Sequence, residues 1–163
     1  MTIAPDINKL AAIKEAFEGF QNVAYLDTGG VWTVGYGSTY NHDKKRKVQK
    51  GDVISKDHAK EWMNIDLQEI RRQLSLYIKV ELSAHQAAAI CDYVYNRGIG
   101  NFLKTQLDEL INANPNDLRI KDEILKTGIK DRLGNLLWGL GRRRRAEAHL
   151  YFTGQLKFDW PRW

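Results

Sequence analysis

Residues 18–37 read Glu-Gly-Phe-Gln-Asn-Val-Ala-Tyr-Leu-Asp-Thr-Gly-Gly-Val-Trp-Thr-Val-Gly-Tyr-Gly. The stretch begins with Glu18 at a helix stop signal and continues as two short β-prone segments joined by a Gly-rich turn. Asp27 ends the first segment and Thr33 lies in the second. Acid-assisted hydrolysis needs one carboxyl group that donates a proton and one ionised carboxylate that steers water or charge. Either carboxylate alone is more simply a solvated side chain, so the joint pattern is what favours a catalytic site.

The two β-prone segments, 23–26 and 31–36, predict a hairpin across Asp27-Thr28-Gly29-Gly30. Alternation in the second segment puts Trp32, Val34 and Tyr36 on one face and leaves Thr33, Gly35 and Gly37 on the other. A strand with one nearly bare face suits the wall of a cleft, because a polymer can approach its backbone. The alternative is that the glycines only serve bulges or twist.

A first helix is predicted from the cap residue Asp6 to Gly19, with Ile7, Leu10, Ile13 and Phe17 as its apolar positions. Glu18 therefore falls in the last turn, at the negative end of the helix dipole. The dipole disfavours the ionised carboxylate there, which suits a proton donor at neutral pH.

Further helices follow from cap residues and apolar periodicity. Ser55 caps a predicted helix that runs to about Lys79 and would span ~37 Å, enough to join two lobes. Ser83 and Gln86 form a predicted capping box for a helix that ends at Gly98. Two shorter helices are predicted, one that includes Leu107, Leu110 and Ile111 and ends before Pro115, and one from 116 or 117 to about 127.

The composition limits the class of protein. A chain of 163 residues with 43% hydrophobic residues and five tryptophans is long enough to bury a core and is not disordered. No apolar run approaches the ~20 residues of a membrane span, and no signal peptide is recognisable. The single cysteine, Cys91, excludes an intramolecular disulfide framework and is expected in the core. No Cys/His cluster has metal-ligand spacing, so no metal or other cofactor is expected.

The net charge of +5 and the pI near 9.3 favour polyanionic partners, which include nucleic acid, anionic membrane and bacterial envelope polymers. Charge alone does not choose between them. The basic run at 44–50 is interpreted as a solvated loop or edge strand rather than a dedicated anion-binding patch.

The spacing within the opening stretch is specific: Asp27 follows Glu18 by nine positions and Thr33 follows Asp27 by six. Together with the flanking Glu-Gly-Phe, Tyr-Leu-Asp and Trp-Thr-Val-Gly-Tyr-Gly, this pattern closely resembles the catalytic region of the bacteriophage lysozyme (endolysin) family, glycoside hydrolase family 24. The resemblance implies an α+β, lysozyme-like fold in one domain, 1–163. A small N-terminal β-hairpin lobe (about 15–58) would be joined by a long helix (about 59–80) to a larger helical lobe, made of about 81–163 and the N-terminal helix.

The same resemblance implies roles for individual residues. Glu18 would be the general acid, and Asp27 and Thr33 would hold the attacking water. Thr39, Tyr95 and Thr105 are candidate substrate contacts, although Tyr95 fits the core equally well.

The segment 138–147 resembles the family's Gly-Leu-x-Arg-Arg-Arg motif, which begins the final helix, so the resemblance implies a helix from Trp138 onward. Helical rotation lets one or two of its four arginines face the cleft and leaves the rest in solvent. Arg143, and after it Arg142, is the expected partner of Glu18. The alternative is a surface run that supplies only solubility and attraction to the anionic envelope.

Two positions depart from the family pattern. The family commonly has a histidine directly after the Gly-x-Gly, where this chain has Ser38, and a frequent Ser-Thr-Leu is replaced by Thr105-Gln106-Leu107. Neither change removes a catalytic group; Ser38 affects a stabilising contact and Gln106 a saccharide contact.

The resemblance implies a monomeric peptidoglycan-degrading muramidase that releases phage from a bacterial host. It would stay in the host cytoplasm until lysis and then act on the wall in the periplasm, with the anionic outer envelope as a further partner of the basic runs. A non-catalytic wall-binding or virion structural module on the same fold is the first alternative. A nucleic-acid binder that uses residues 44–50 and 142–145 is the second, although neither run lies in a recognisable nucleic-acid-binding motif.

Overall fold

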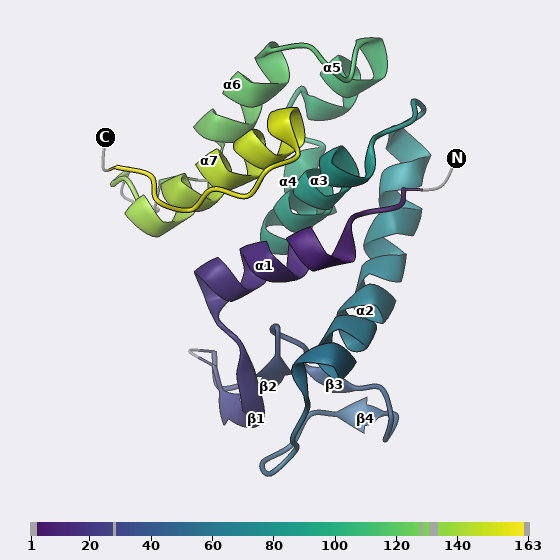
Figure 1. Ribbon diagram of the computed structural model, residues 1–163, viewed down its shortest axis with the longest axis vertical. Helices are drawn as coiled ribbons and strands as arrows, with labels where there is room; N and C mark the ends of the chain where they lie inside the picture. Colours follow the sequence, from purple (N-terminus) through teal and green to yellow (C-terminus); the bar gives the residue numbers. More distant parts are fainter. Residues whose placement is uncertain (1–2, 28, 128, 131–133, 162–163) are drawn as a thin grey trace.

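The computed structural model describes residues 3–27, 29–127, 129–130 and 134–161. In chain order its elements are α1 (Ile7–Glu18), β1 (Gln21–Leu26), β2 (Trp32–Gly35), β3 (Tyr40–Asn41), β4 (Arg46–Lys47), α2 (Lys56–Tyr77), α3 (Ala84–Arg97), α4 (Ile99–Phe102), α5 (Leu107–Ala113), α6 (Arg119–Lys126) and α7 (Trp138–Thr153). Figure 1 shows the strands gathered below the helices, with α2 running up from the strands into the helical part. The predicted α+β, lysozyme-like fold class is confirmed.

The predicted boundaries of α1, α2 and α3 hold because their cap residues make the expected hydrogen bonds, whereas α6 begins at Arg119, after the predicted start at 116 or 117. The side chains of Asp6, Ser55 and Ser83 accept from backbone N–H groups at the starts of α1, α2 and α3. Ser83 and Gln86 form the full capping box. Gly98 ends α3, and its N–H donates to the carbonyl of Val94.

The predicted hairpin is the antiparallel pair of β1 and β2, with an irregularity in register between Gln21 and Tyr25. The turn residue Thr28 lies outside the described residues. The predicted bare face of β2 is wrong at Gly35, where φ is +67° and a Cβ would lie 3.1 Å from Cβ of Ala59. This side of the strand is covered by α2, and glycine is needed for backbone geometry and close packing. Thr33, on the same predicted face, is also buried.

Part of the basic run at 44–50 forms strand β4, which pairs with β3. Lys44 and Arg46 both form ion pairs with Asp52, whose pKa is held below its ordinary value chiefly by hydrogen bonds from these two side chains. The edge-strand interpretation therefore describes this segment better than an anion-binding patch.

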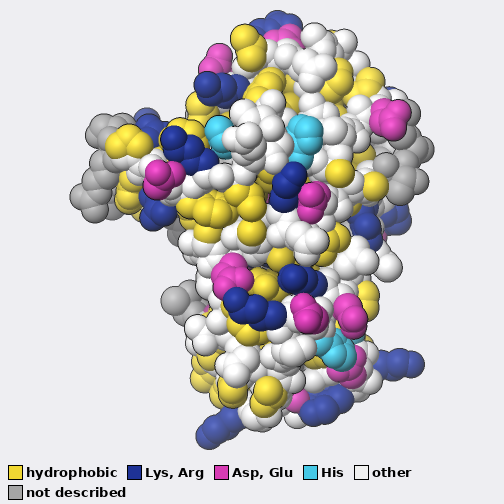
Figure 2. All heavy atoms as spheres, viewed as in Figure 1, with side chains coloured by type: hydrophobic (Ala, Val, Ile, Leu, Met, Phe, Trp, Pro, Cys, Tyr) yellow, Lys and Arg dark blue, Asp and Glu magenta, His cyan; other side chains and the backbone are white. Residues whose placement is uncertain are grey.

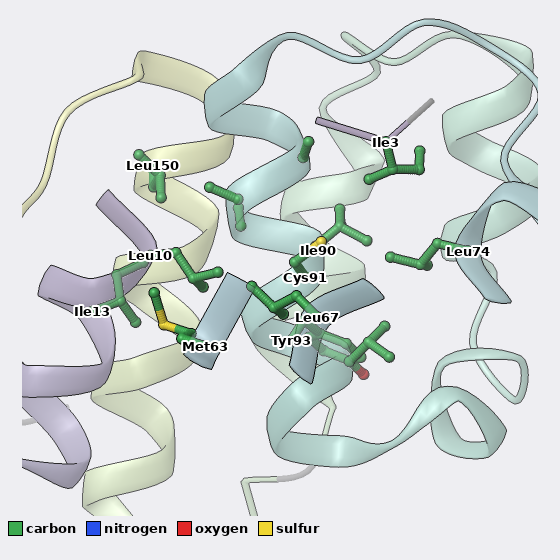
Figure 3. Close-up of a cluster of buried hydrophobic side chains, with 14 of the residues drawn as sticks. Ile3, Leu10, Ile13, Met63, Leu67, Leu74, Ile90, Cys91, Tyr93 and Leu150 are labelled. Carbon is green, nitrogen blue, oxygen red and sulfur yellow. The ribbon is translucent and has the colours of Figure 1, made fainter. Parts of the chain in front are cut away.

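The core lies where α3 packs against α1, α2 and α7. Figure 3 shows Leu10 and Ile13 of α1, Met63 and Leu67 of α2, and Leu150 of α7 around the residues of α3. Each such side chain contributes about 1.5–3 kcal/mol when fully buried. Cys91 is among them, and burial raises the pKa of its thiol to about 12, so it is a core residue as predicted. None of the helices within the described residues has both the length and the apolar character needed to cross a membrane.

Candidate active site

Glu18 is the last residue of α1, because Gly19 takes a φ of +78° and its N–H donates to the carbonyl of Glu15. The site is thus at the point where α1 leads into β1 (Figure 1). The Glu18 side chain is 31% exposed, so solvent or a substrate can reach it.

Arg143 from α7 holds one oxygen of this carboxylate. Its Nη1 donates to Oε1 of Glu18 over 2.5 Å, while Nε and Nη2 donate to the two oxygens of Asp92 over 2.9 and 2.8 Å. Arg143 is only 3% exposed and Asp92 is fully buried. Burial by itself raises the pKa of Asp92, but the Arg143 cation and its hydrogen bonds keep that pKa below its ordinary value. One guanidinium therefore binds a buried carboxylate and an accessible one at the same time.

The other oxygen of Glu18 faces Gly37. A Cβ built on Gly37 would lie 3.3 Å from Oε2 of Glu18 and 3.6 Å from the hydroxyl oxygen of Tyr95, and φ of Gly37 is +99°. A side chain at position 37 would therefore be strained and would crowd both groups. The bare backbone at Gly37 lets Glu18 and Tyr95 lie close together. The sequence alone did not decide whether Tyr95 is a site residue or a core residue.

Asp27 and Thr33 are linked through the backbone of Val31. Oδ1 of Asp27 accepts from the N–H groups of Gly29 and Val31, each over 2.8 Å. The carbonyl of Val31 in turn accepts from the N–H of Asp27 over 3.0 Å and from Oγ1 of Thr33 over 3.1 Å. The turn therefore fixes the carboxylate and the hydroxyl relative to each other. Because the Thr33 hydrogen points at a carbonyl, its oxygen keeps lone pairs that can accept from water.

Thr39 and Thr105 are not brought to Glu18 by any contact among the described residues. Thr39 is exposed and lines a hollow of about 440 Å³ beside Trp32, Tyr40 and Lys47. The hydroxyl of Thr105 donates to the carbonyl of Phe102 over 2.6 Å and accepts from the N–H of Leu107. These bonds shape the turn that leads into α5.

The four arginines of α7 have different partners. Arg142 donates to the carbonyl of Phe158 rather than to Glu18, and Arg145 donates to the carbonyl of Pro161. Arg144 is fully buried, where Nη2 donates to Oδ1 of Asn96 and the guanidinium carbon lies 4.6 Å from the centroid of the Tyr93 ring. The prediction that the arginines away from the cleft stay in solvent is therefore wrong for Arg144, because α7 packs against α3 on that side.

Ser38, which stands where the family commonly has histidine, makes a polar contact of its own. Its Oγ donates to Oδ2 of Asp66 over 2.8 Å, and Nε2 of His42 lies 2.6 Å from Oδ1 of the same carboxylate. Both contacts attach the segment after β2 to α2.

Sequence reasoning missed three charged residues near the site: Lys14, Asp92 and Asp66. A signal existed for two of them. Lys14 falls among the apolar positions of α1, and Asp92 lies within the apolar run of α3. A charged residue inside an apolar stripe is buried, and a buried charge needs a partner. Asp66 had no comparable signal, because its importance depends on Ser38 and His42.

Comparison with known proteins identifies the family of the chain. The family model "Phage lysozyme" matches residues 15–147. An endolysin of Acyrthosiphon pisum secondary endosymbiont phage 1 is 32% identical over 137 residues, which cover 83% of this chain and 89% of that protein. A SAR-endolysin of Bacteriophage PS119 is 34% identical over 142 residues, 86% of this chain and 80% of that one. A crystal structure of a P22 lysozyme mutant superposes with a TM-score of 0.80 at 26% identity, over 92% of this chain and 99% of that one. The chain belongs to the phage lysozyme family.

Proposed function

We propose that this chain, a peptidoglycan-lysing endolysin, is a muramidase that hydrolyses the β-1,4 bond between N-acetylmuramic acid and N-acetylglucosamine. The observation that supports acid-assisted hydrolysis is the placement of Glu18, and the choice of this bond rests on the family resemblance. Glu18 is an accessible carboxyl group held by Arg143 beside the bare backbone of Gly37. It directly precedes the β1–β2 hairpin, which carries Asp27 and Thr33. The endolysins and phage lysozymes among its relatives support the same reading.

In the proposed reaction the proton of Glu18 passes to the glycosidic oxygen as the bond to the anomeric carbon breaks. A water molecule attacks that carbon from the opposite face of the sugar. The Asp27 carboxylate accepts a proton from this water, and the Thr33 oxygen orients it. Arg143 keeps the Glu18 side chain in one position while the proton is transferred.

The two alternatives have less support. The relatives are endolysins, and none of them favours a non-catalytic module. A nucleic-acid binder would need free cations, but Lys44 and Arg46 pair with Asp52, and all four arginines of α7 contact other parts of the chain. On the face shown in Figure 2, basic and acidic side chains are interspersed rather than gathered into one basic patch.

The cell wall is the site of action, and we propose that the enzyme stays in the host cytoplasm until lysis and then reaches the wall from the periplasmic side. We also propose that it acts as a monomer. The net charge of +5 also supports an electrostatic attraction of the enzyme to the anionic outer envelope.

The test compares Glu18→Gln with Glu15→Gln, a matched change of an exposed glutamate on the same helix. Glu18→Gln keeps the shape but removes the proton donor, so we expect lysis to fall by at least ~10²–10⁴-fold. Glu15→Gln should retain most activity. The assay is the loss of turbidity of outer-membrane-permeabilised cells, with circular dichroism to verify folding. Borohydride reduction of the wild-type products should label muramic acid.

Labelled glucosamine instead of muramic acid would overturn the bond specificity. Full activity of a folded Glu18→Gln protein would overturn the role of Glu18.

A further inference from the structure

Lys14 is a buried cation that the proposed chemistry does not use. It lies on α1 one helical turn before Glu18, its side chain is fully buried, and its Nζ has no hydrogen-bond partner among the described residues. Lysine is rarely fully buried without a partner, because removing an ammonium group from water is costly. A residue that weakens the fold in this way calls for a role that a hydrophobic side chain could not fill.

The nearest partner of Lys14 is an aromatic ring. Its Nζ lies 2.9 Å from the centroid of the Tyr95 ring, which is a cation–π contact made by a fully buried cation. The charged groups that face Lys14 come from all the helices around it: Asp92 on α3, Glu18 on α1, Arg143 on α7 and Asp66 on α2. Burial lowers the pKa of Lys14 to about 8, and the three carboxylates offset this only in part.

The hydroxyl end of Tyr95 reaches the candidate active site. Its oxygen and Oε2 of Glu18 both lie within about 4 Å of the position that a Cβ would take on Gly37. Tyr95 therefore connects the buried cation on one side with the proposed acid on the other. The position of its hydroxyl depends on how firmly the ring is held.

We propose that Lys14 is a positioning residue that, in its charged form, holds the Tyr95 ring so that the hydroxyl stays beside Glu18 and Gly37, where the saccharide binds. The inference rests on the proposed function, which it deepens by adding a residue that acts through Tyr95. It explains why a cation is kept at this position although an apolar side chain would pack there at lower cost. Neutral Lys14 lacks the cation–π contact, so the ring is held less firmly when the amine loses its proton.

The test compares Lys14→Met with Lys9→Met, a half-exposed lysine earlier on the same helix. Lys14→Met keeps the chain length but removes the charge. We expect kcat/KM on soluble peptidoglycan fragments to fall roughly 5- to 30-fold, the range that a desolvated cation–π contact is worth. The melting temperature at pH 7 should rise, because a buried charge without a hydrogen bond is removed. Lys9→Met should change neither quantity appreciably.

The pH profile separates positioning from a merely structural role. Wild-type activity should decline with a midpoint near pH 8, the value at which Lys14 loses its charge, and this decline should be absent in Lys14→Met and in Tyr95→Leu. The double variant should lose no more activity than Tyr95→Leu alone, because both changes remove one interaction. In the wild type, the ε-carbon resonance of Lys14 should titrate near pH 8 by NMR, well below the ~10.4 of an ordinary lysine.

An unchanged kcat/KM and pH profile in folded Lys14→Met, or additive losses in the double variant, would overturn the inference. If Lys14→Met does not fold, the Tyr95→Leu variant provides the test. A decline of activity near pH 8 that persists in Tyr95→Leu would overturn the inference. Loss of activity in Glu18→Gln together with a normal Lys14→Met protein would overturn only the role of Lys14. Retained activity in Glu18→Gln would instead reject the proposed function.

Discussion

Arg143 donates to Glu18 over 2.5 Å across 125 positions of the sequence. The same guanidinium binds the fully buried Asp92 through its Nε and Nη2 groups. The orientation of Glu18 at the end of α1 therefore depends on how α7 packs against α3. The packing of α7 and the geometry of the candidate active site are thus coupled.

The first prediction concerns Arg143 itself. Arg143→Gln should destabilise the fold by about 3–5 kcal/mol, because it leaves the buried Asp92 carboxylate without its partner. Activity measured below the melting temperature should be low at every salt concentration, because a buried pair is poorly screened. Arg142→Gln is the control, since that side chain contacts the carbonyl of Phe158 and an aromatic ring instead. Melting curves measure the stability of the two variants, and lysis assays at low and high salt measure their activity.

Two outcomes would contradict this prediction. Equal, small losses for Arg142→Gln and Arg143→Gln that disappear at high salt would indicate a run of arginines that only attracts the enzyme to an anionic envelope. A stable Arg143→Gln protein would show that Asp92 does not depend on the guanidinium.

Thr33 should tolerate serine better than valine. Serine keeps a hydroxyl that can donate to the carbonyl of Val31 and accept from the proposed water, whereas valine removes both functions and leaves that carbonyl short of one donor. We expect Thr33→Ser to retain most of its kcat and Thr33→Val to lose it by a factor of ten or more, about 1.4 kcal/mol. The comparison uses single variants with matched melting curves. Equal activity of the two variants would show that the hydroxyl holds no catalytic water.

The proposed reaction inverts the anomeric configuration, because water held by Asp27 and Thr33 attacks opposite the leaving group. The carboxyl groups of Glu18 and Asp27 should then be separated by about 6.5–9.5 Å in the complex with substrate, rather than the ~5 Å of retaining enzymes. Proton NMR of a fresh digest should show the α-anomer of the new reducing end first. Initial appearance of the β-anomer, or a trapped glycosyl adduct on Asp27, would exclude this mechanism.

The sequence predicted the elements that depend on local signals. Helix ends are set by hydrogen bonds that span only a few residues, so the residues that cap them could be recognised without a structure. These residues are Asp6, Ser55, Ser83, Gly19 and Gly98. Placing Glu18 at the end of α1 followed from the same signals.

The contacts that hold the site could not be predicted in this way, because they join distant segments. The alternation pattern predicts an open face at Gly35, but α2 covers this face, and no local pattern shows which helix does so. Helical rotation alone predicts solvent for the arginines that do not face the cleft, because it does not show that a neighbouring helix packs on Arg144. Arg143 could be placed from the family resemblance, yet its simultaneous contact with Asp92 required three helices to be positioned together.

The last prediction concerns Glu147, a fully buried carboxyl group beside Arg144 and Arg143. Burial, with the neighbouring Asp92 charge, raises the pKa of Glu147 well above its ordinary value, although the two arginines oppose the shift. Above pH ~4.5 the unfolded chain therefore holds fewer protons than the folded one, and the contribution of Glu147 to stability falls as pH rises.

Glu147→Gln keeps the shape of the side chain but cannot ionise. Its melting temperature should thus exceed that of the wild type by a margin that is small near pH 4.5 and grows towards pH 7. Glu61→Gln, an exposed position on α2, is the control and should show no such trend. Calorimetry at several pH values measures the margin. A variant that becomes less stable than the wild type as pH rises would mean that Glu147 is ionised in the fold and that its pairing with Arg144 outweighs the cost of burial.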